Sequence, residues 1–179
     1  TMAKEKTPRI VIVGGGIGGT AAAFALRDAL GDKAEILLVS DKEKFRFTPS
    51  NPWVAIGWRD PAAIAIDLKG AMAHRGIEFV PTAVTALAPR ESHIVLQDGQ
   101  QIGYDQLIIA TGPELAFDEV EGLAPGGNIV SVCTTAHAIE ANAAFERFCD
   151  DPGPIVVGAA PGASCFGPAY EYALMLDTE

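Results

Sequence analysis

Glycines at positions 14, 16 and 19 have the spacing of a nucleotide-binding loop. They follow a continuous apolar run, residues 9–13, and precede an alanine-rich segment that is typical of a helix. The first glycine permits a tight turn, the second lets the backbone approach a pyrophosphate, and the third lets the helix pack closely on the strand. Backbone N–H groups at the start of the helix attract the phosphates. We therefore predict a dinucleotide site formed by Gly14, Gly16, Ile17, Gly18 and Gly19.

A second apolar run, residues 154–160, also leads into a glycine-containing loop, but this loop departs from the nucleotide pattern. The positions of the three glycines are occupied by Gly158, Ala160 and Ala163. The third position tolerates alanine, whereas the Cβ of Ala160 stands where a pyrophosphate would approach the backbone. NAD binding at this second loop is therefore disfavoured.

Two cysteines lie where ligands bind in open α/β sheets. Cys165 follows the second loop at the expected start of a helix, whose dipole favours a thiolate, and Cys133 ends the preceding apolar run, residues 128–133. We expect both thiols at the carboxyl ends of neighbouring strands, facing one crevice. Cys149 falls late in a helix and is expected to contribute to packing. The three cysteines show no zinc-type spacing, and we predict no metal site.

The surrounding elements alternate between strands and helices, as in a doubly wound α/β fold. Strands are expected at residues 9–13, 34–39, 76–82 and 104–112, with a β-meander inserted at residues 83–101, where Asp98-Gly99 is a hairpin signal. One helix, or two short ones, is expected within residues 60–76, with Asp60 as an N-cap and Pro61 at the first helical position.

The pattern of expected strands and helices is interrupted after Pro113. Residues 114–127 look like a linker, followed by a strand at 128–133, a helix capped by Thr134 or Thr135, a strand at 154–160 and a last helix. We therefore predict a Rossmann-like domain over residues 1–113, and the beginning of a second Rossmann-like unit over residues 114–179.

Composition excludes several classes of function. The net charge of −10 argues against nucleic acid as a partner, because its phosphates would be repelled. No window approaches the roughly 18 consecutive apolar residues that are needed to cross a bilayer, and the first ten residues lack the apolar region of a secretory signal.

The first site also needs a group for the adenosine ribose, which an acidic residue at the end of the second strand usually binds. That position holds Ser40, with Asp41 next to it. The ATG motif at Ala110, Thr111 and Gly112, with the meander inserted before it, resembles the FAD-binding domain of the flavoprotein disulfide reductase superfamily. The resemblance implies FAD rather than NAD.

That superfamily resemblance also assigns further contacts. It implies that the adenine lies along a backbone segment that includes Ala83 and Val84, and that the ATG turn approaches the pyrophosphate. The loop that contains Thr48 and Pro49 is expected to fold against the flavin or its ribityl chain.

Four motifs narrow the family. SVCTTAHA, DPGPIVVGAAPGASCFGPAYE, FTPSNPWVAIGW and ATGP together closely resemble the sulfide:quinone oxidoreductases, over essentially the whole chain. Members of that family oxidise sulfide to polysulfide or sulfur and pass the electrons through FAD to a membrane quinone. Full-length members are much longer, so the chain is interpreted as an N-terminal fragment that is itself inactive and soluble. The full-length form is expected to be peripheral to a membrane, and its oligomeric state stays open.

The same resemblance implies the catalytic residues. Cys165 matches a cysteine next to the flavin, Cys133 matches a second cysteine implicated in sulfide oxidation, and His137 and Glu171 are groups near them. In a helix, His137 would lie one turn beyond Cys133, where it could take a proton from sulfide or stabilise a thiolate.

Two other functions stay open from the sequence. One is an NADH-dependent quinone or disulfide reductase of the same fold, against which Ala160 and Cys165 argue. The other is a non-catalytic flavin-binding subunit that pairs with a cytochrome.

Overall fold

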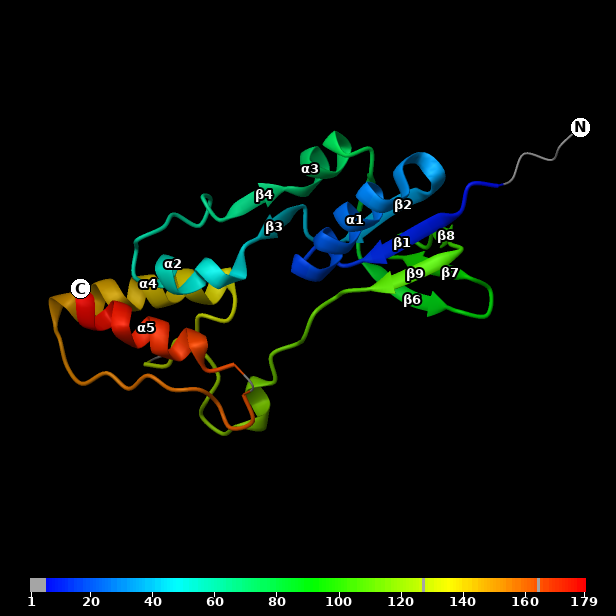
Figure 1. Ribbon diagram of the computed structural model, residues 1–179. Helices are drawn as coiled ribbons and strands as arrows, with labels where there is room; N and C mark the ends of the chain where they lie inside the picture. The colour runs from blue at the N-terminus through cyan, green and yellow to red at the C-terminus, as the bar shows by residue number, and fades with distance from the viewer. Residues whose placement is uncertain (1–5, 127, 164) are drawn as a thin grey trace, which may run out of the picture. The chain divides into compact units, whose positions relative to one another are not determined.

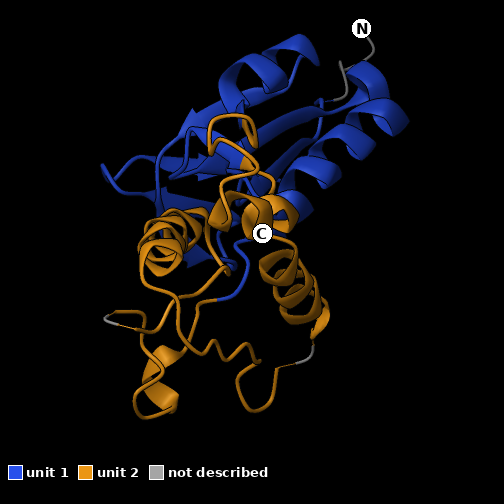
Figure 2. Ribbon diagram, turned by 90° about the vertical axis from the view of Figure 1, so that its left-hand side faces the viewer, with its two compact units in different colours: residues 1–45, 66–113 blue, residues 46–65, 114–179 orange. Residues whose placement is uncertain are grey.

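A computed structural model describes residues 6–126, 128–163 and 165–179, and the chain divides into two compact units (Figures 1 and 2). Unit 1 comprises residues 1–45 and 66–113, and unit 2 comprises residues 46–65 and 114–179. One limit of unit 2 falls directly after Pro113. Segment 46–65, which the sequence suggested for the first domain, groups with unit 2 because its buried side chains pack there.

Unit 1 is built on a parallel sheet in the order β5-β2-β1-β9. The strands are β1 (Arg9–Val13), β2 (Glu35–Ser40), β5 (Glu78–Pro81) and β9 (Gln106–Ile109). Their β-branched and leucine residues are buried on both faces of the two central strands, as continuous apolar runs in a parallel sheet require. This arrangement confirms the predicted Rossmann-like α/β fold.

Alternate residues of the central strands build two separate cores. Ile12 and Leu38 face a core shared with α1 (Ile17–Leu30) and α3 (Leu68–His74). Val11 and Val39 face a second core, on the side of the inserted meander. The sheet is therefore the middle layer of unit 1, with helices on one face and the meander on the other. The period of two along each strand determines which residues enter which core.

The meander contains β6 (Val84–Ala88), β7 (His93–Leu96) and β8 (Gln101–Gly103), which pair in an antiparallel manner. The predicted hairpin turn is confirmed. Gly99 has φ +85°, which a side chain disfavours, and the Asp98 carboxylate accepts the N–H of Gln100 at 2.9 Å.

A short ribbon of β3 (Lys44–Arg46) and β4 (Ala65–Asp67) carries the chain into unit 2 and back. The expected helix start at Asp60 is wrong: α3 begins at Leu68, and its N-cap is Asp67, whose carboxylate accepts the Gly70 N–H at 2.6 Å. The Asp60 carboxylate instead accepts the N–H of Ala62 in a turn. Both aspartates offer the same local cap, but residues 61–64 form a turn and β4 follows it, so the helix begins only after Asp67.

Replacing Asp67 by alanine should lower the free energy of unfolding by about 1 kcal/mol, because the Gly70 N–H loses its acceptor. Urea denaturation followed by circular dichroism measures this change. Asp60→Ala is the matched control and should cost less, because it removes the acceptor of a turn rather than of a helix. An equal or larger loss in the control would contradict the assignment of the cap.

Unit 2 contains three helices, α2 (Asn51–Ala55), α4 (Thr135–Asp150) and α5 (Gly167–Thr178), in its described residues. A 3-10 turn at Thr48–Ser50 leads into α2, and another spans Phe117–Glu119. The core joins α2 to the other two helices through small and medium-sized side chains. Its buried members are Val54, Ala55, Ile56, Ile64, Ala138, Ala141, Tyr172 and Met175. Burial raises the pKa of Tyr172 above its ordinary value, because the phenolate is desolvated.

The helix ends of unit 2 agree with the sequence. Thr134 is the N-cap of α4, and its hydroxyl accepts the N–H of His137 at 3.1 Å. In α5, Pro168 occupies the first turn, so the loop before this helix is long, as predicted.

The predicted strands at residues 128–133 and 154–160 are not formed. Gly126 and Ile129 make one isolated bridge, and the side chain of Val156 is 96% exposed. A parallel strand needs hydrogen-bonded neighbours on its edges, and the described part of the chain offers these two segments none. The helices of the second Rossmann-like unit are therefore present without its sheet.

Candidate functional site

The loop between β1 and α1 is held closely against the residues that follow β9. Gly14 has φ +113°, and its N–H donates to the carbonyl of Val39 at 2.8 Å. A Cβ at Gly14 would collide with the carbonyl of Ala110 and lie 2.9 Å from the nitrogen of Thr111. The structure therefore brings together two predicted parts of the nucleotide site, the glycine loop and the ATG turn.

Gly16 is the residue around which a ligand has room. A Cβ built on it meets nothing within 4 Å, whereas a Cβ at Gly19 would collide with the Gly14 carbonyl oxygen. Gly16 is the N-cap of α1, and the first turn contains no acidic residue. The free N–H groups of that turn, which includes Ile17 and Gly18, fit the pyrophosphate of a dinucleotide.

Replacing Gly16 by alanine should weaken FAD binding about tenfold or more, and leave the fold intact. The added Cβ stands in the open space that the pyrophosphate needs, and the extended backbone at Gly16 (φ −81°) accepts any residue. Titration of the apoprotein with FAD, followed by flavin fluorescence, measures the affinity. Gly153→Ala is the control, because its Cβ also meets nothing within 4 Å and lies in unit 2. Unchanged affinity in Gly16→Ala would place the pyrophosphate elsewhere.

Ser40 and Asp41, the candidates for the ribose, differ in their surroundings. Ser40 is 5% exposed, and its hydroxyl accepts the N–H of Lys42 at 3.1 Å. A Cβ at Gly15 would lie 2.8 Å from that hydroxyl, so Ser40 packs beneath the glycine loop. Asp41 is exposed and forms an ion pair with Lys42 at 2.7 Å. Asp41 is therefore the more accessible of the two to a ribose hydroxyl.

The other predicted FAD contacts lie in three places. Ala83 and Val84 are half-buried at the start of β6, where the Ala83 carbonyl accepts the N–H of Gln97 at 2.9 Å. Gly112, in the ATG turn, has φ +77°. Thr48 and Pro49 are exposed and belong to unit 2. Their roles toward FAD stay predictions.

The thiols that could do chemistry are free and exposed in unit 2. Cys133 lies two residues before α4, and its N–H donates to the hydroxyl of Ser131 at 3.1 Å. Cys165 lies two residues before α5, although not at the end of a strand as predicted. Cys149 is also exposed, so the expectation that it packs is wrong.

His137 lies in the first turn of α4, four residues after Cys133. Its ring meets the edge of Phe117, with the centroids 5.4 Å apart at an interplanar angle of 70°. The Nδ1 atom is buried and has no hydrogen-bond partner in the described residues, so Nε2 is the more accessible ring nitrogen. Glu171 is half-buried in α5. Among the described residues, no hydrogen bond or ion pair links Glu171 or Cys165 to His137.

Sequence reasoning missed a buried polar contact in unit 2. The side chain of Asn51 is fully buried, and its Oδ1 accepts the hydroxyl of Thr135 at 3.1 Å. In the sequence, the only indication of this contact was an asparagine next to the apolar segment of α2. That pattern is also typical of a solvent-exposed helix cap, so it did not predict a buried contact.

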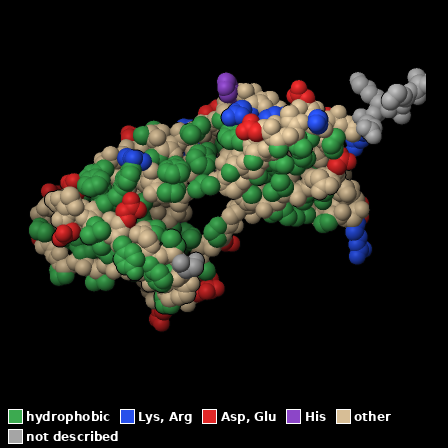
Figure 3. Space-filling model, in the orientation of Figure 1, with side chains coloured by type: hydrophobic (Ala, Val, Ile, Leu, Met, Phe, Trp, Pro, Cys, Tyr) green, Lys and Arg blue, Asp and Glu red, His purple; other side chains and the backbone are tan. Residues whose placement is uncertain are grey.

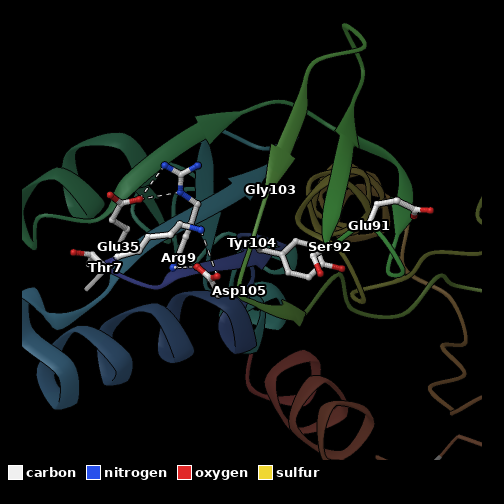
Figure 4. A pocket seen from close by; sticks show the side chains of 9 residues that line it. Thr7, Arg9, Glu35, Glu91, Ser92, Gly103, Tyr104 and Asp105 are labelled. Atoms are coloured by element: carbon white, nitrogen blue, oxygen red, sulfur yellow. Dashed lines mark hydrogen bonds and ion pairs between the residues drawn. The ribbon is translucent and has the colours of Figure 1, made fainter. Parts of the chain in front are cut away.

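A hollow of about 660 Å³ lies at the amino ends of the unit 1 strands, opposite the edge that carries the glycine loop (Figure 4). Two ion pairs join four of its charged side chains, and Glu91 is a further acidic group in its lining. Arg9 pairs with Glu35 at 2.9 Å, and Lys6 pairs with Asp105 at 3.5 Å. The Asp105 carboxylate also accepts the N–H of Arg9 at 2.7 Å, which lowers its pKa. We assign this hollow no part in the site.

The described residues were also searched for metal-binding groups and for membrane-spanning helices. They contain no group of three histidine, cysteine or acidic side chains arranged to hold a metal ion. None of their helices is both long enough and apolar enough to cross a membrane.

Comparison with known proteins gives a consistent picture. The chain is 43% identical, over 95% of its length, to the sulfide-quinone reductase of Aquifex aeolicus, and it spans 39% of that protein. The X-ray structure of the sulfide:quinone oxidoreductase from this hyperthermophilic bacterium matches 96% of the chain with a TM-score of 0.87. The alternative NAD(P)H-ubiquinone oxidoreductase C1 of Arabidopsis thaliana is 30% identical over 66% of this chain, and the match covers 26% of that protein. The similarity to sulfide:quinone oxidoreductases that the motifs predicted is confirmed.

Residues 8–164 match the family described as pyridine nucleotide-disulphide oxidoreductase. Members of this family are FAD-binding flavoproteins, in agreement with the predicted cofactor and with the room at Gly16. The match covers most of the chain, including the glycine loop, the ATG turn and Cys133. The chain therefore belongs to the pyridine nucleotide-disulphide oxidoreductase family.

Proposed function

We propose that the full-length protein is a flavoenzyme that oxidises sulfide to polysulfide or sulfur and passes the electrons through FAD to a membrane quinone. The 43% identity to a sulfide-quinone reductase supports this proposal. The observation that carries it is the placement of two free, exposed thiols, Cys133 and Cys165, before the helices of unit 2. We also propose that the full-length protein is peripheral to the membrane in which its quinone resides.

Each residue has a defined part in this chemistry. Oxidation of one hydrosulfide ion to zero-valent sulfur releases two electrons and one proton, and bound FAD supplies the two-electron acceptor. The sulfur atom is carried on Cys165, with Cys133 as the second thiol. His137 accepts the proton at Nε2, because its Nδ1 is enclosed beside Phe117. Glu171 is the second proposed proton acceptor.

NADH oxidation is the competing function, because one relative is named an NAD(P)H-ubiquinone oxidoreductase. The loop before α5 argues against it in this chain. It has Ala160 at the position of the second glycine, and its described residues form no helix before Gly167. A pyrophosphate that approached this loop would meet a methyl group and would lack the adjoining helix start.

Flavin absorbance of the anaerobic full-length protein tests the proposal. Sulfide is added to one sample and NADH to a matched sample. We expect bleaching by sulfide alone, with recovery when quinone is added. Bleaching by NADH alone would reject sulfide oxidation and would leave both cysteines without a catalytic part. A flavin that neither reductant bleaches would support the non-catalytic subunit instead.

A further inference from the structure

An anionic substrate faces an unfavourable surface in unit 2. Residues 46–65 and 114–179 contain three arginines and no lysine, against twelve carboxylates. On the face seen in Figure 3, the part that contains α2, α4 and α5 shows broad hydrophobic areas with scattered acidic side chains and little basic surface. Near pH 7 a substantial share of sulfide is the hydrosulfide anion. Its approach to thiols in such a unit requires a local positive potential.

The helices α2 and α4 lie side by side and run in the same direction (Figure 1). Asn51, at the start of α2, bonds to Thr135, at the start of α4. Beyond the other end of α2, a Cβ at Gly57 would lie 3.2 Å from Nδ2 of Asn142, two turns along α4. The amino-terminal ends of the two helices therefore meet. For the 16-residue α4, the helix dipole makes this end positive.

Arg59 is fixed at the same end of the pair. Its guanidinium donates to the hydroxyl of Ser50 at 2.7 Å and lies 3.7 Å above the centroid of the Trp53 ring. Ser50 is 2% exposed and immediately precedes α2. Arg59 forms no ion pair with a described carboxylate, and the carboxylate of neighbouring Asp60 instead accepts the Ala62 N–H. A stacked guanidinium with an uncompensated charge is preorganised for an anion.

A buried donor without a partner provides a second observation at this end. Asn51 is 0% exposed, and its Nδ2 has no acceptor in the described residues. A buried N–H₂ group without an acceptor costs free energy, so its position next to the first residue of α4 indicates a missing acceptor. Cys133 precedes this helix start by two residues, and His137 lies in its first turn.

We propose that the amino-terminal end of the α2–α4 pair is an anion site that draws hydrosulfide to Cys133, with Arg59 as its fixed cation. The identity of the anion rests on the proposed sulfide oxidation, whereas the site rests on this geometry. Asp118 and Glu119 directly follow Phe117, whose ring touches His137. Their charges repel anions from the vicinity, and Arg59 offsets them.

Alkylation of the thiols tests the site without FAD or sulfide. Anionic iodoacetate and neutral iodoacetamide react with the same thiolate, so the ratio of their rates reports the local potential and cancels differences in thiol ionisation. The rates at Cys133 and Cys149 are followed separately by peptide mass spectrometry on the 179-residue chain. Cys149, near the carboxyl end of α4, is the internal control.

In Arg59→Gln we expect the iodoacetate-to-iodoacetamide ratio to fall about threefold or more at Cys133 and to stay unchanged at Cys149. In Arg59→Lys, which keeps the positive charge, the ratio at Cys133 should stay close to that of the unmodified chain. Arg147→Gln, two residues before Cys149, should change the ratio at Cys149 only. An unchanged ratio at Cys133 in a folded Arg59→Gln variant, as judged by circular dichroism, would overturn the proposal.

If Arg59→Gln does not fold, the salt dependence of the alkylation ratio in the unmodified chain still tests the anion site. Raising the salt concentration should lower the ratio at Cys133 and should not lower it at Cys149, which neighbours acidic Asp150 and Asp151. The same response at both thiols would reject the site. A positive result together with a flavin that sulfide does not bleach would retain the anion site and reject only sulfide as its ligand.

Discussion

Replacing Gly19 by alanine should lower the free energy of unfolding of unit 1 by about 3 kcal/mol or more. The new Cβ would collide with the carbonyl oxygen of Gly14, and it would lie 3.5 Å from a methyl group of Ile12. Gly14 cannot retreat, because its N–H is bonded to Val39 and its own Cα faces the Ala110 carbonyl. Helix α1 would have to move away from the sheet. Urea denaturation of the variant and the unmodified chain measures the change.

Gly18→Ala is the matched control for this prediction. It changes a glycine in the same helical turn, and its Cβ would meet the Ala110 Cβ at 3.8 Å, an ordinary contact. We expect Gly18→Ala to be neutral or to stabilise the helix by up to about 1 kcal/mol, because alanine loses less conformational entropy. Equal destabilisation by both variants would mean that the loop has another conformation.

The second large effect concerns Cys165. In the full-length protein, Cys165→Ser should slow sulfide-dependent reduction of the flavin by about 100-fold or more, because a hydroxyl cannot carry the sulfur atom. The flavin absorbance spectrum and the content of FAD should not change, since Cys165 lies outside the glycine loop. Anaerobic stopped-flow measurement of flavin bleaching provides the rate.

Cys149→Ser tests whether the loss is specific to Cys165. Cys149 is as free and exposed as Cys165, but it lies near the carboxyl end of α4 rather than before a helix. Its replacement should leave the rate unchanged. Sulfide-dependent bleaching at the normal rate in Cys165→Ser would remove Cys165 from the proposed mechanism and would leave Cys133 as the remaining candidate.

Much of unit 1 could be predicted because its determinants are local. Continuous β-branched runs identify strands buried on both faces, and these became the parallel sheet. The glycine spacing identified a loop in which each position has its own steric requirement, visible at Gly14, Gly16 and Gly19. The Asp98-Gly99 turn and the Thr134 cap depend on their own neighbours alone, and both formed as expected.

The candidate site was less predictable, because its parts depend on partners that are distant in sequence. Thr135 and Asn51 are separated by 84 positions and meet only after α2 and α4 pack. Arg59 stacks on Trp53 and donates a hydrogen bond to Ser50, and no pattern in the sequence predicted either contact. A helical spacing predicted His137 one turn beyond Cys133, but α4 begins only at Thr135, and the contact with Phe117 selects which ring nitrogen stays accessible.

The sequence by itself determined the α/β class, the glycine loop and the position of Cys133 and Cys165 before helices. It also determined the similarity to the sulfide:quinone oxidoreductases. Those features follow from residue type and short spacing. The tertiary structure alone decided that segment 46–65 groups with unit 2, that Asp67 rather than Asp60 starts α3, and that residues 128–133 and 154–160 form no strands. The physical reason is that an apolar segment becomes a strand, or joins a core, only where other segments satisfy its backbone and cover its side chains. Two equivalent local caps are likewise distinguished only by how the chain between them packs.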